Sequence, residues 1–387
     1  MSNGVTRAVG KAIAHPDRVV PALKRKIGTL AYYFGDGSRA ADPCRITLFV
    51  NNVCNARCTV CDVGQRNRGS AFFQQATQSG DRLFSTDDCR LLMSQVAHIR
   101  PQINLHGVEP LLHPSLLDLI ATIKRTGCFL SLTTNGTLLP QVASDLIDLR
   151  VDSVTVSLDG PERLHDRIRG SAAYRPAIEG IQLLKQRRAQ SSRASTRIST
   201  SFCISDSNYR SITEYADLML RQAQVDHITF IHLQYVTESA SEAFNRQFSS
   251  LGRATPTHLQ ATDLARIDPE ALWDQLQQVR SRYPADRVDY NIDFRRKSKL
   301  LSFYRDPCHF FLKKTCKVPW VSSTVLANGD VIINSRCFPY RTGNIHESTF
   351  PEIWRGERYK SFRMAVRKAR VFPVCSRCCG TYPRVVH

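Results

Sequence analysis

Acidic residues and long apolar runs are both scarce in this sequence. Its 387 residues contain 34 Asp and Glu against 53 Lys and Arg, which gives a net charge of +19. No apolar run approaches the ~18 residues of a membrane-spanning helix, and no apolar segment typical of a secretory signal peptide begins the chain. Hydrophobic residues at 42% and charged residues at 22% exclude a disordered or collagen-like chain. We therefore expect a folded cytoplasmic protein with one large and one smaller domain.

The positive charge is concentrated in three segments. Residues 1–40, 181–210 and 340–387 together carry +17 of the +19. These segments are either solvated surfaces or binding sites for an anionic partner. The anionic partner could be a phosphorylated small molecule, a nucleic acid or an acidic membrane surface. Composition does not separate these alternatives.

Residues 1–43 are predicted to form a basic helical extension. Apolar residues recur at helical spacing beside the basic run 24–26, at Val19, Leu23, Ile27, Leu30 and Phe34. Such a helix either packs its apolar face on the following domain or contacts a membrane surface.

From residue 44 to 237, short apolar and β-branched runs alternate with helical patterns. The predicted strands are 46–50, 102–106, 129–133, 153–158, 197–203 and 227–233. The predicted helices are 86–98, 114–126, 138–149, 173–190 and 208–223, the first of them capped by Ser85 or Thr86. This alternation predicts an α/β fold, a partial (β/α)6 TIM-like barrel whose chemistry lies at the strand ends.

The rest of the chain changes in composition. Residues 238–265 are rich in Ser, Ala, Thr and Gln and are predicted to be a linker or lid; a helix near 268–283 and a strand near 287–293 then complete the barrel, up to residue 300. Residues 301–387 are aromatic, basic and cysteine-rich. They are predicted to form a small α+β domain.

The chain has thirteen cysteines, and their chemical role depends on where the protein resides. A reducing cytosol disfavours disulfides, so metal or redox chemistry is the leading use. Cys54, Cys58 and Cys61 form a C-x3-C-x2-C triplet directly after the first strand. Thiolates select zinc or an iron–sulfur cluster, and three ligands on a four-iron cluster leave one iron open to a substrate. The alternatives are a zinc site completed by Cys44 or a histidine, and buried thiols with no role.

Three further motifs follow the next three strands: Gly107–Pro110, Thr133–Gly136 and Ser157–Pro161. With the cysteine triplet, they make residues 44–235 resemble the radical S-adenosylmethionine (SAM) enzymes in order and spacing. The resemblance implies that Cys54, Cys58 and Cys61 bind a catalytic 4Fe-4S cluster whose fourth iron chelates SAM.

The resemblance also implies a set of cofactor-binding residues: Gly107, Glu109, Asn135, Ser157 and Arg169. Glu109 corresponds to the acceptor of the methionine amino group. Val108 stands where the family has a second glycine, and a β-branched residue there argues against positive φ. A turn serine and a surface arginine are the alternatives for Ser157 and Arg169.

Six cysteines follow residue 300, and four of them resemble a SPASM or twitch auxiliary-cluster domain: Cys316, Cys337, Cys375 and Cys378. Two fully cysteine-ligated clusters would need eight thiols, so one auxiliary 4Fe-4S cluster is expected. Cys308 and Cys379 are either inert or replace one of the four. A zinc ribbon on the same thiols is the alternative. The segment 326–333 is predicted to form a hairpin around Asn-Gly-Asp.

The resemblance to the radical SAM enzymes implies a radical mechanism, and we expect an oxidoreductase. A 5′-deoxyadenosyl radical from SAM would abstract a substrate hydrogen, and the auxiliary cluster would serve oxidation or epimerisation of a small, sugar or aminocyclitol-like and anionic substrate. Cys203 is a candidate hydrogen donor or a packed small residue, and His232, Gln234 and Tyr235 either line the substrate pocket or cap the barrel. A flavodoxin or ferredoxin is the expected reductant.

Three other functions remain open. Some relatives modify peptides, but the 45 residues before the first strand are few for a separate peptide-binding domain. An RNA-modifying radical enzyme would use the basic segments, although no RNA-binding motif is evident. The third is a zinc-binding nucleic-acid module, and nucleic acid is not the expected partner.

Overall fold

The computed structural model describes residues 28–34, 36–78, 80, 82–192, 195–307, 310, 315–333 and 336–378. Most of the predicted N-terminal helix lies outside these residues, as do Cys308 and Cys379. None of the helices described is long and apolar enough to cross a membrane.

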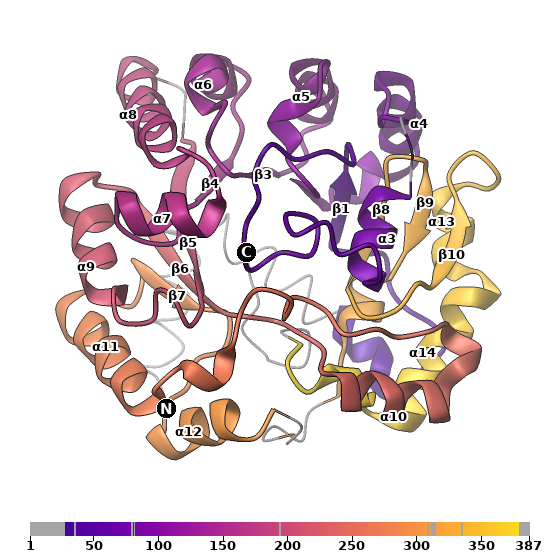
Figure 1. Cartoon of the computed structure of the whole chain (residues 1–387). Helices are drawn as coiled ribbons and strands as arrows, with labels where there is room; N and C mark the ends of the chain where they lie inside the picture. Colours follow the sequence, from indigo (N-terminus) through magenta and orange to yellow (C-terminus); the bar gives the residue numbers. More distant parts are fainter. Residues whose placement is uncertain are drawn as a thin grey trace, which may run out of the picture.

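A ten-stranded sheet forms the centre of the molecule (Figure 1). Its strands are β1 (Arg45–Phe49), β2 (Gln102–His106), β3 (Leu130–Thr134), β4 (Ser153–Ser157), β5 (Arg197–Ile204), β6 (His227–His232), β7 (Val288–Tyr290), β8 (Ser322–Val325), β9 (Asp330–Ile332) and β10 (Arg341–Asn344). They lie in the order β10-β9-β8-β1-β2-β3-β4-β5-β6-β7, and all pairs from β8 to β7 are parallel. The six strands predicted for the partial barrel are therefore confirmed.

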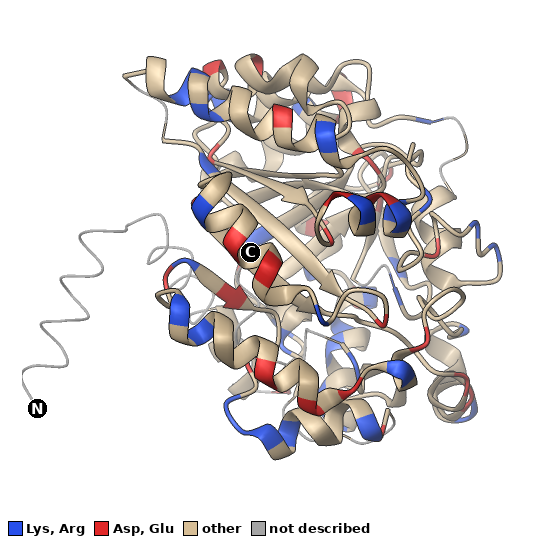
Figure 2. Cartoon of the chain, turned by 60° about the vertical axis from the view of Figure 1, so that its left-hand side comes forward, with Lys and Arg blue, Asp and Glu red and all other residues tan. Residues whose placement is uncertain are grey.

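Helices cover the outside of this curved sheet (Figure 1). They are α3 (Ala71–Thr77), α4 (Thr86–Val96), α5 (Leu116–Arg125), α6 (Leu139–Asp148), α7 (Glu162–Arg169), α8 (Tyr174–Gln190), α9 (Ile212–Asp217), α10 (Glu238–Phe248), α11 (Pro269–Arg282), α12 (Lys297–Arg305), α13 (Phe350–Arg355) and α14 (Glu357–Ala369). Ser85 caps α4 in a reciprocal capping box with Asp88, as its sequence predicts. In the view of Figure 2, Lys and Arg are interspersed with Asp and Glu on these helices.

The region 238–265 differs from the predicted linker because it begins with α10. Thr237 caps this helix by accepting a hydrogen bond from the N–H of Ala240. Phe244 anchors the helix: it is fully buried and stacks on Phe338, with ring centroids 4.4 Å apart. Helix α10 is therefore stabilised by packing against Phe338, which lies about 90 residues later in the chain.

The C-terminal region continues the barrel sheet. Strand β8 pairs in parallel with β1, with Arg45 opposite Ser322 and Leu48 opposite Val325. The predicted hairpin is β8–β9, and Gly329 in its turn has a φ of +85°. The loop after β1, which carries the first cysteine triplet, thus lies beside the strands that lead to Cys337.

Candidate functional site

The loop that carries the first three cysteines is fixed by backbone hydrogen bonds to the end of α7. The N–H of Arg57 donates to Arg169 O at 2.8 Å, and the N–H of Thr59 donates to Ile168 O at 2.9 Å. Gly64 is required by close packing, because a Cβ there would lie 2.5 Å from Cys58 N. The loop conformation is therefore set by the fold around it.

The thiols of this triplet lie close enough to affect one another. The pKa of Cys58 is raised to about 12: burial is the main cause, Arg169 opposes it, and the charges of Cys61 and Cys54 add to it. Burial is also the main cause of the raised pKa of Cys54. Metal binding needs thiolates, so the positive charge of bound iron would offset these costs.

The donors around the sulfurs fit an iron–sulfur cluster. Ala56 N–H points at Cys54 Sγ at 3.4 Å, Asn135 Nδ2 lies 3.9 Å from the same sulfur, and Arg169 Nη1 lies 3.6 Å from Cys58 Sγ. Hydrogen bonds to ligand sulfurs are typical of such sites. Within the described residues, no three His, Cys, Asp or Glu side chains gather tightly enough for a single metal ion. A four-iron cluster needs a wider spacing, because each thiolate binds a different iron.

Glu109 joins the ends of β2 and β3. It is buried, and it accepts hydrogen bonds from Thr134 Oγ1 at 2.7 Å, Asn135 N at 2.7 Å and Leu111 N at 3.0 Å. Burial raises its pKa, whereas these bonds lower it. A carboxylate has about four acceptor sites, so Glu109 keeps capacity for one more donor, such as an amino group.

The turn between β2 and Glu109 requires glycine at its first position. Gly107 has a φ of +121°, and a Cβ there would lie 3.1 Å from Phe49. Val108 does not adopt a positive φ, as its branched side chain predicts. The substitution of the family's second glycine therefore leaves this turn unstrained.

Asn135 contacts the cysteine loop itself. Its Nδ2 donates to Asn55 Oδ1 at 2.7 Å, and its Oδ1 accepts from Thr137 N at 2.9 Å. Asn135 is therefore expected to bind the cofactor and also to position the cysteine loop. Ser157, whose hydroxyl is also expected to bind SAM, accepts a hydrogen bond from Ser201 Oγ at 3.4 Å.

Asp159 is a site residue that sequence reasoning missed. It is fully buried, its Oδ2 lies 2.6 Å from Arg169 Nη2, and its Oδ1 accepts from Cys203 N at 2.8 Å. His165 Nδ1 in turn accepts from Asp159 N at 3.0 Å. Burial lowers the pKa of His165 to about 4, so its ring is neutral. The sequence did offer a signal for this pair: Asp159 directly follows an apolar strand, and Arg169 lies ten residues after it.

The four predicted auxiliary ligands come together from both sides of the β8–β9 hairpin: Cys316 precedes β8, and Cys337, Cys375 and Cys378 follow β9. The pKa of Cys316 is raised to about 12, mainly by burial and in part by the charges of Cys378 and Cys337. Burial likewise raises the pKa of Cys375, and the charges of Cys378, Cys337 and Cys316 raise it further. Cys337 is buried and the other three cysteines are half-buried. Four thiols that affect one another make a donor set suited to a second cluster.

Polar groups also surround the interior end of β6. His232 is fully buried, and its Nδ1 lies 2.7 Å from Tyr304 Oη. Tyr235 is buried beside this end, whereas Gln234 is half-buried. Phe294 and Phe303 pack edge-on against the His232 ring. The predicted pocket residues are thus at the strand end, with His232 held in an aromatic cluster.

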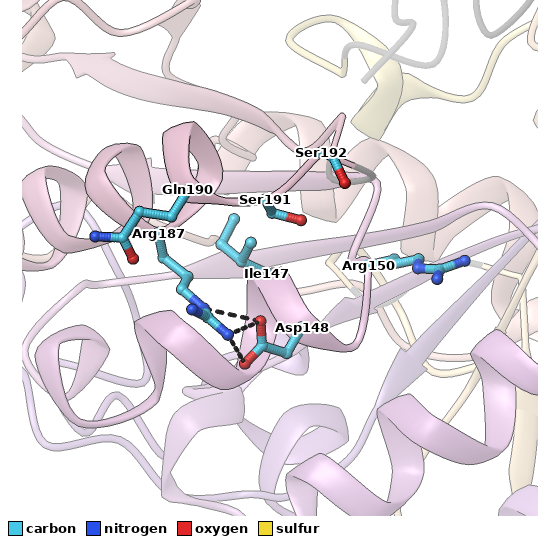
Figure 3. Close-up of a pocket in the computed structure, with 7 residues that line it drawn as sticks. All are labelled: Ile147, Asp148, Arg150, Arg187, Gln190, Ser191 and Ser192. Atoms are coloured by element: carbon cyan, nitrogen blue, oxygen red, sulfur yellow. Dashed lines mark hydrogen bonds and ion pairs between the residues drawn. The ribbon is translucent and has the colours of Figure 1, made fainter.

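A surface pocket of about 290 Å³ lies elsewhere, between the C-terminal ends of α6 and α8 (Figure 3). These ends precede β4 and β5, so the pocket is at the opposite end of the barrel from the cysteines. Arg187 and Asp148 form a double hydrogen bond across it, both at 2.9 Å. Arg150 also lines it.

Parallel strand ends that carry three thiols, beside a region that carries four more, define an enzyme with two iron–sulfur centres. Residues 48–219 match the family model for the radical SAM superfamily, and residues 316–379 match that for an iron–sulfur cluster-binding domain, SPASM. The chain belongs to the radical SAM superfamily and carries a SPASM domain at its C-terminal end. These two domains imply SAM, a catalytic 4Fe-4S cluster and an auxiliary 4Fe-4S cluster as its cofactors.

Curated relatives resemble the chain over different lengths. The tungsten-containing aldehyde ferredoxin oxidoreductase cofactor-modifying protein of Pyrococcus furiosus is 24% identical over 343 residues, 86% of each chain. The Fe-coproporphyrin III synthase of Methanosarcina barkeri is 27% identical over 185 residues. That match covers 47% of this chain and only 42% of the relative.

Solved structures share the fold. SuiB of Streptococcus suis bound to precursor peptide SuiA matches with a TM-score of 0.59 and 14% identity, over 84% of this chain and 67% of SuiB. anSMEcpe with bound SAM matches with a TM-score of 0.55 and 17% identity, over 83% of this chain and 82% of that one.

Proposed function

We propose that the protein is a radical SAM epimerase or oxidoreductase that acts on a small polyhydroxylated molecule, sugar or aminocyclitol-like. Support for a small substrate comes from the names of curated relatives, which refer to Fe-coproporphyrin III, to GTP and to the cofactor of a tungsten-containing enzyme. In this proposal the N-terminal triplet binds the catalytic cluster and the four C-terminal thiols bind the auxiliary one. The reductant is a flavodoxin or ferredoxin.

The observation that carries the proposal is the placement of Cys203. Its backbone is held at the end of β5 by Asp159 Oδ1, which accepts from its N–H, and by Asn208 Nδ2, which donates to its carbonyl at 2.8 Å. Burial and the Asp159 charge raise the pKa of its thiol. The sulfur therefore keeps its hydrogen at neutral pH, which a hydrogen-atom donor requires.

SAM, if held at the catalytic cluster by the N-terminal cysteines, would supply the radical chemistry that removes one hydrogen atom from the substrate. The chain's own residues orient the reactants: Glu109 offers an acceptor for an amino group, and Arg169 presents a fixed positive charge beside Cys58. In epimerisation, Cys203 then gives its S–H hydrogen to the other face of the substrate carbon, so an S–H bond breaks and a C–H bond forms. The sulfur regains one electron from the external reductant and one proton from water.

The first experiment measures formation of 5′-deoxyadenosine by the reconstituted enzyme with SAM and dithionite. Hexose phosphates, hexuronic acids, aminocyclitols, synthetic peptides and transfer RNA are added separately. We expect stimulation by a small molecule alone. Stimulation by a peptide would instead favour the second candidate, a peptide-modifying enzyme, which the shared fold with peptide-bound SuiB supports.

The second experiment follows solvent deuterium with the stimulating compound in D2O. Epimerisation predicts one deuterium per product, and Cys203→Ala should abolish its incorporation while 5′-deoxyadenosine still forms. Cys89→Ala is the control, because this buried thiol lies in α4 away from the site. A product two electrons more oxidised, with no deuterium in the wild type, would identify oxidation and remove the donor role of Cys203.

A further inference from the structure

A short helical segment before β1 exposes a group of large apolar side chains. Residues 28–33 are helical, and η1 (Ala31–Tyr33) is their last turn. Leu30, Tyr33 and Phe34 are 50%, 60% and 69% exposed, and their spacing of three and four residues places them near one side of the helix. The other exposed large apolar side chains of the described chain lie singly: Val53, Leu91 and Met364. Grouped apolar side chains on a surface, unlike single ones, mark interaction sites.

The opposite side of this segment packs on the C-terminal region. Gly28 is buried, and a Cβ there would lie 3.0 Å from Val321 Cγ1. The Tyr32 ring packs edge-on against Trp320 with centroids 5.1 Å apart, and Tyr32 Oη donates to Thr315 Oγ1 at 3.2 Å. Because these contacts hold one side of the segment on the domain, the apolar group on the other side faces solvent.

This arrangement bears on the apolar stripe of the N-terminal extension. The sequence leaves two uses for the stripe, which are packing on the following domain and contact with a membrane surface. Leu30 and Phe34 belong to the stripe, yet both are exposed. Tyr32, which lies outside the stripe, makes the contact with the domain instead. The described end of the stripe is therefore available for contact with a membrane surface.

Positive charge borders the apolar group. Lys317 Nζ lies 4.1 Å from the centroid of the Tyr33 ring and donates a hydrogen bond to Tyr33 Oη. The guanidinium carbon of Arg367 lies 5.9 Å from the centroid of the Tyr32 ring. In the sequence, the basic run 24–26 shortly precedes the group. Basic residues beside an apolar surface attract anionic lipids.

The acidic residues nearest to the group in sequence have other partners. Asp36 Oδ1 accepts a hydrogen bond from Ser38 N at 2.8 Å, and Asp42 Oδ1 lies 2.7 Å from Arg355 Nη2. Residues 1–40 hold seven Lys and Arg against two acids. The net charge of this part of the chain is therefore positive and complements an anionic surface.

We propose that Leu30, Tyr33 and Phe34 insert into the headgroup region of an acidic lipid membrane and that Lys317 contacts the lipid phosphates. Tyrosine suits this depth, because its ring is apolar and its hydroxyl is polar. Apolar burial and attraction to anionic lipids add together in peripheral binding of this kind. A protein partner matches the group less well, because a stable protein interface buries about 800 Å² on each side and three side chains supply only part of that area.

The test is cosedimentation of the full-length, reconstituted protein with lipid vesicles. One preparation contains phosphatidylglycerol and phosphatidylcholine in equal parts, and the other contains phosphatidylcholine alone. We expect the protein to sediment with the acidic vesicles only, and added salt should weaken the binding because it screens the charges. The measurement needs no turnover, so its result is independent of the proposed function.

Two variants test the surface itself. Phe34→Ser should weaken binding to the acidic vesicles about tenfold, because one aromatic side chain is no longer buried. Lys317→Gln should weaken it about fivefold, because one positive charge is lost. Leu91→Ser is the apolar control, since Leu91 is a single exposed residue of α4, and Arg150→Gln in the pocket of Figure 3 is the charge control. Both controls should bind as the wild type does.

Phe34→Ser should keep the iron content and the thermal midpoint of the wild type, because the Phe34 side chain is exposed. Binding of the wild type to neither vesicle, equal binding to both vesicles, or unchanged binding by Phe34→Ser would overturn the proposal. A dimer seen by sedimentation velocity without lipid, and dissociated by Phe34→Ser, would also overturn it, because a second copy of the chain would then cover the group.

Discussion

Asp159 and Arg169 form a 2.6 Å ion pair whose carboxylate is completely buried. The other edge of the Arg169 guanidinium faces Cys58 Sγ at 3.6 Å. The pair thus links the ends of β4 and α7 to the loop that carries the catalytic cysteines. Its geometry leads to the first prediction.

Asp159→Asn should lower the free energy of unfolding by about 3 kcal/mol, because it leaves the Arg169 charge buried without its counter-ion. Anaerobic denaturation of the reconstituted protein measures this change. Asp148→Asn, which breaks a solvent-exposed Arg187 pair, should change stability little. If the two variants unfold alike, the buried pair contributes no special stability.

Iron counting tests the ligand assignment. The wild type should hold about eight irons, and a triple Cys54, Cys58 and Cys61→Ala variant should hold about four. Cys375→Ala combined with Cys378→Ala should remove the other four. Retention of all the iron in the triple variant would show that the N-terminal triplet is not the ligand set, and zinc in place of iron would contradict both assignments.

His232 should make stability depend on pH. Burial lowers its pKa to about 3 in the folded protein, against about 6.5 in the unfolded chain. The unfolded state therefore binds the proton first, so stability is lost as pH falls below about 6.5, by up to about 1.4 kcal/mol per pH unit. His232→Gln keeps an acceptor for Tyr304 but cannot titrate, so urea denaturation at pH 7 and 5.5 should show a smaller loss. Equal losses would mean that His232 is protonated in the folded state.

Two glycines with positive φ form a matched pair. At Gly136, with a φ of +86°, a Cβ would lie 2.7 Å from Ala177 Cβ and 2.8 Å from Val156 Cγ1. At Gly127, with a φ of +72°, a Cβ would meet nothing within 4 Å. Gly127→Ala should cost about 1 kcal/mol from backbone strain alone. Gly136→Ala should cost about 2–4 kcal/mol because overpacking is added. Thermal unfolding of both variants checks the difference, and equal shifts would show that the clash relaxes without cost.

The parts of the fold set by local pattern were predictable from the sequence. Apolar and β-branched runs placed β1 to β6 within a residue or so of their positions, because a strand covered on both faces needs a continuous apolar run. Ser85 and Asp88 indicated the start of α4 by capping chemistry. Helix α10 was missed, because its apolar stripe is short and its aromatic partners lie far along the chain.

Some residues of the candidate site were predictable from the sequence and others were not. Cysteine spacing and strand-end motifs pointed to the thiols and to Glu109, since those residues are close together in sequence. The contacts of Asp62 with His258 and of His258 with Arg336 could not be predicted, because tertiary folding alone joins three segments separated by 196 and 78 residues. No local pattern encodes such a contact.

The pairing of β1 with β8 has a consequence for how the protein is made. Arg45 meets Ser322, so the first strand of the barrel stays open along one edge until most of the chain has been synthesised. An unpaired strand edge invites association with other chains. A fragment that ends before β8 should therefore expose this edge of β1 and associate with other chains.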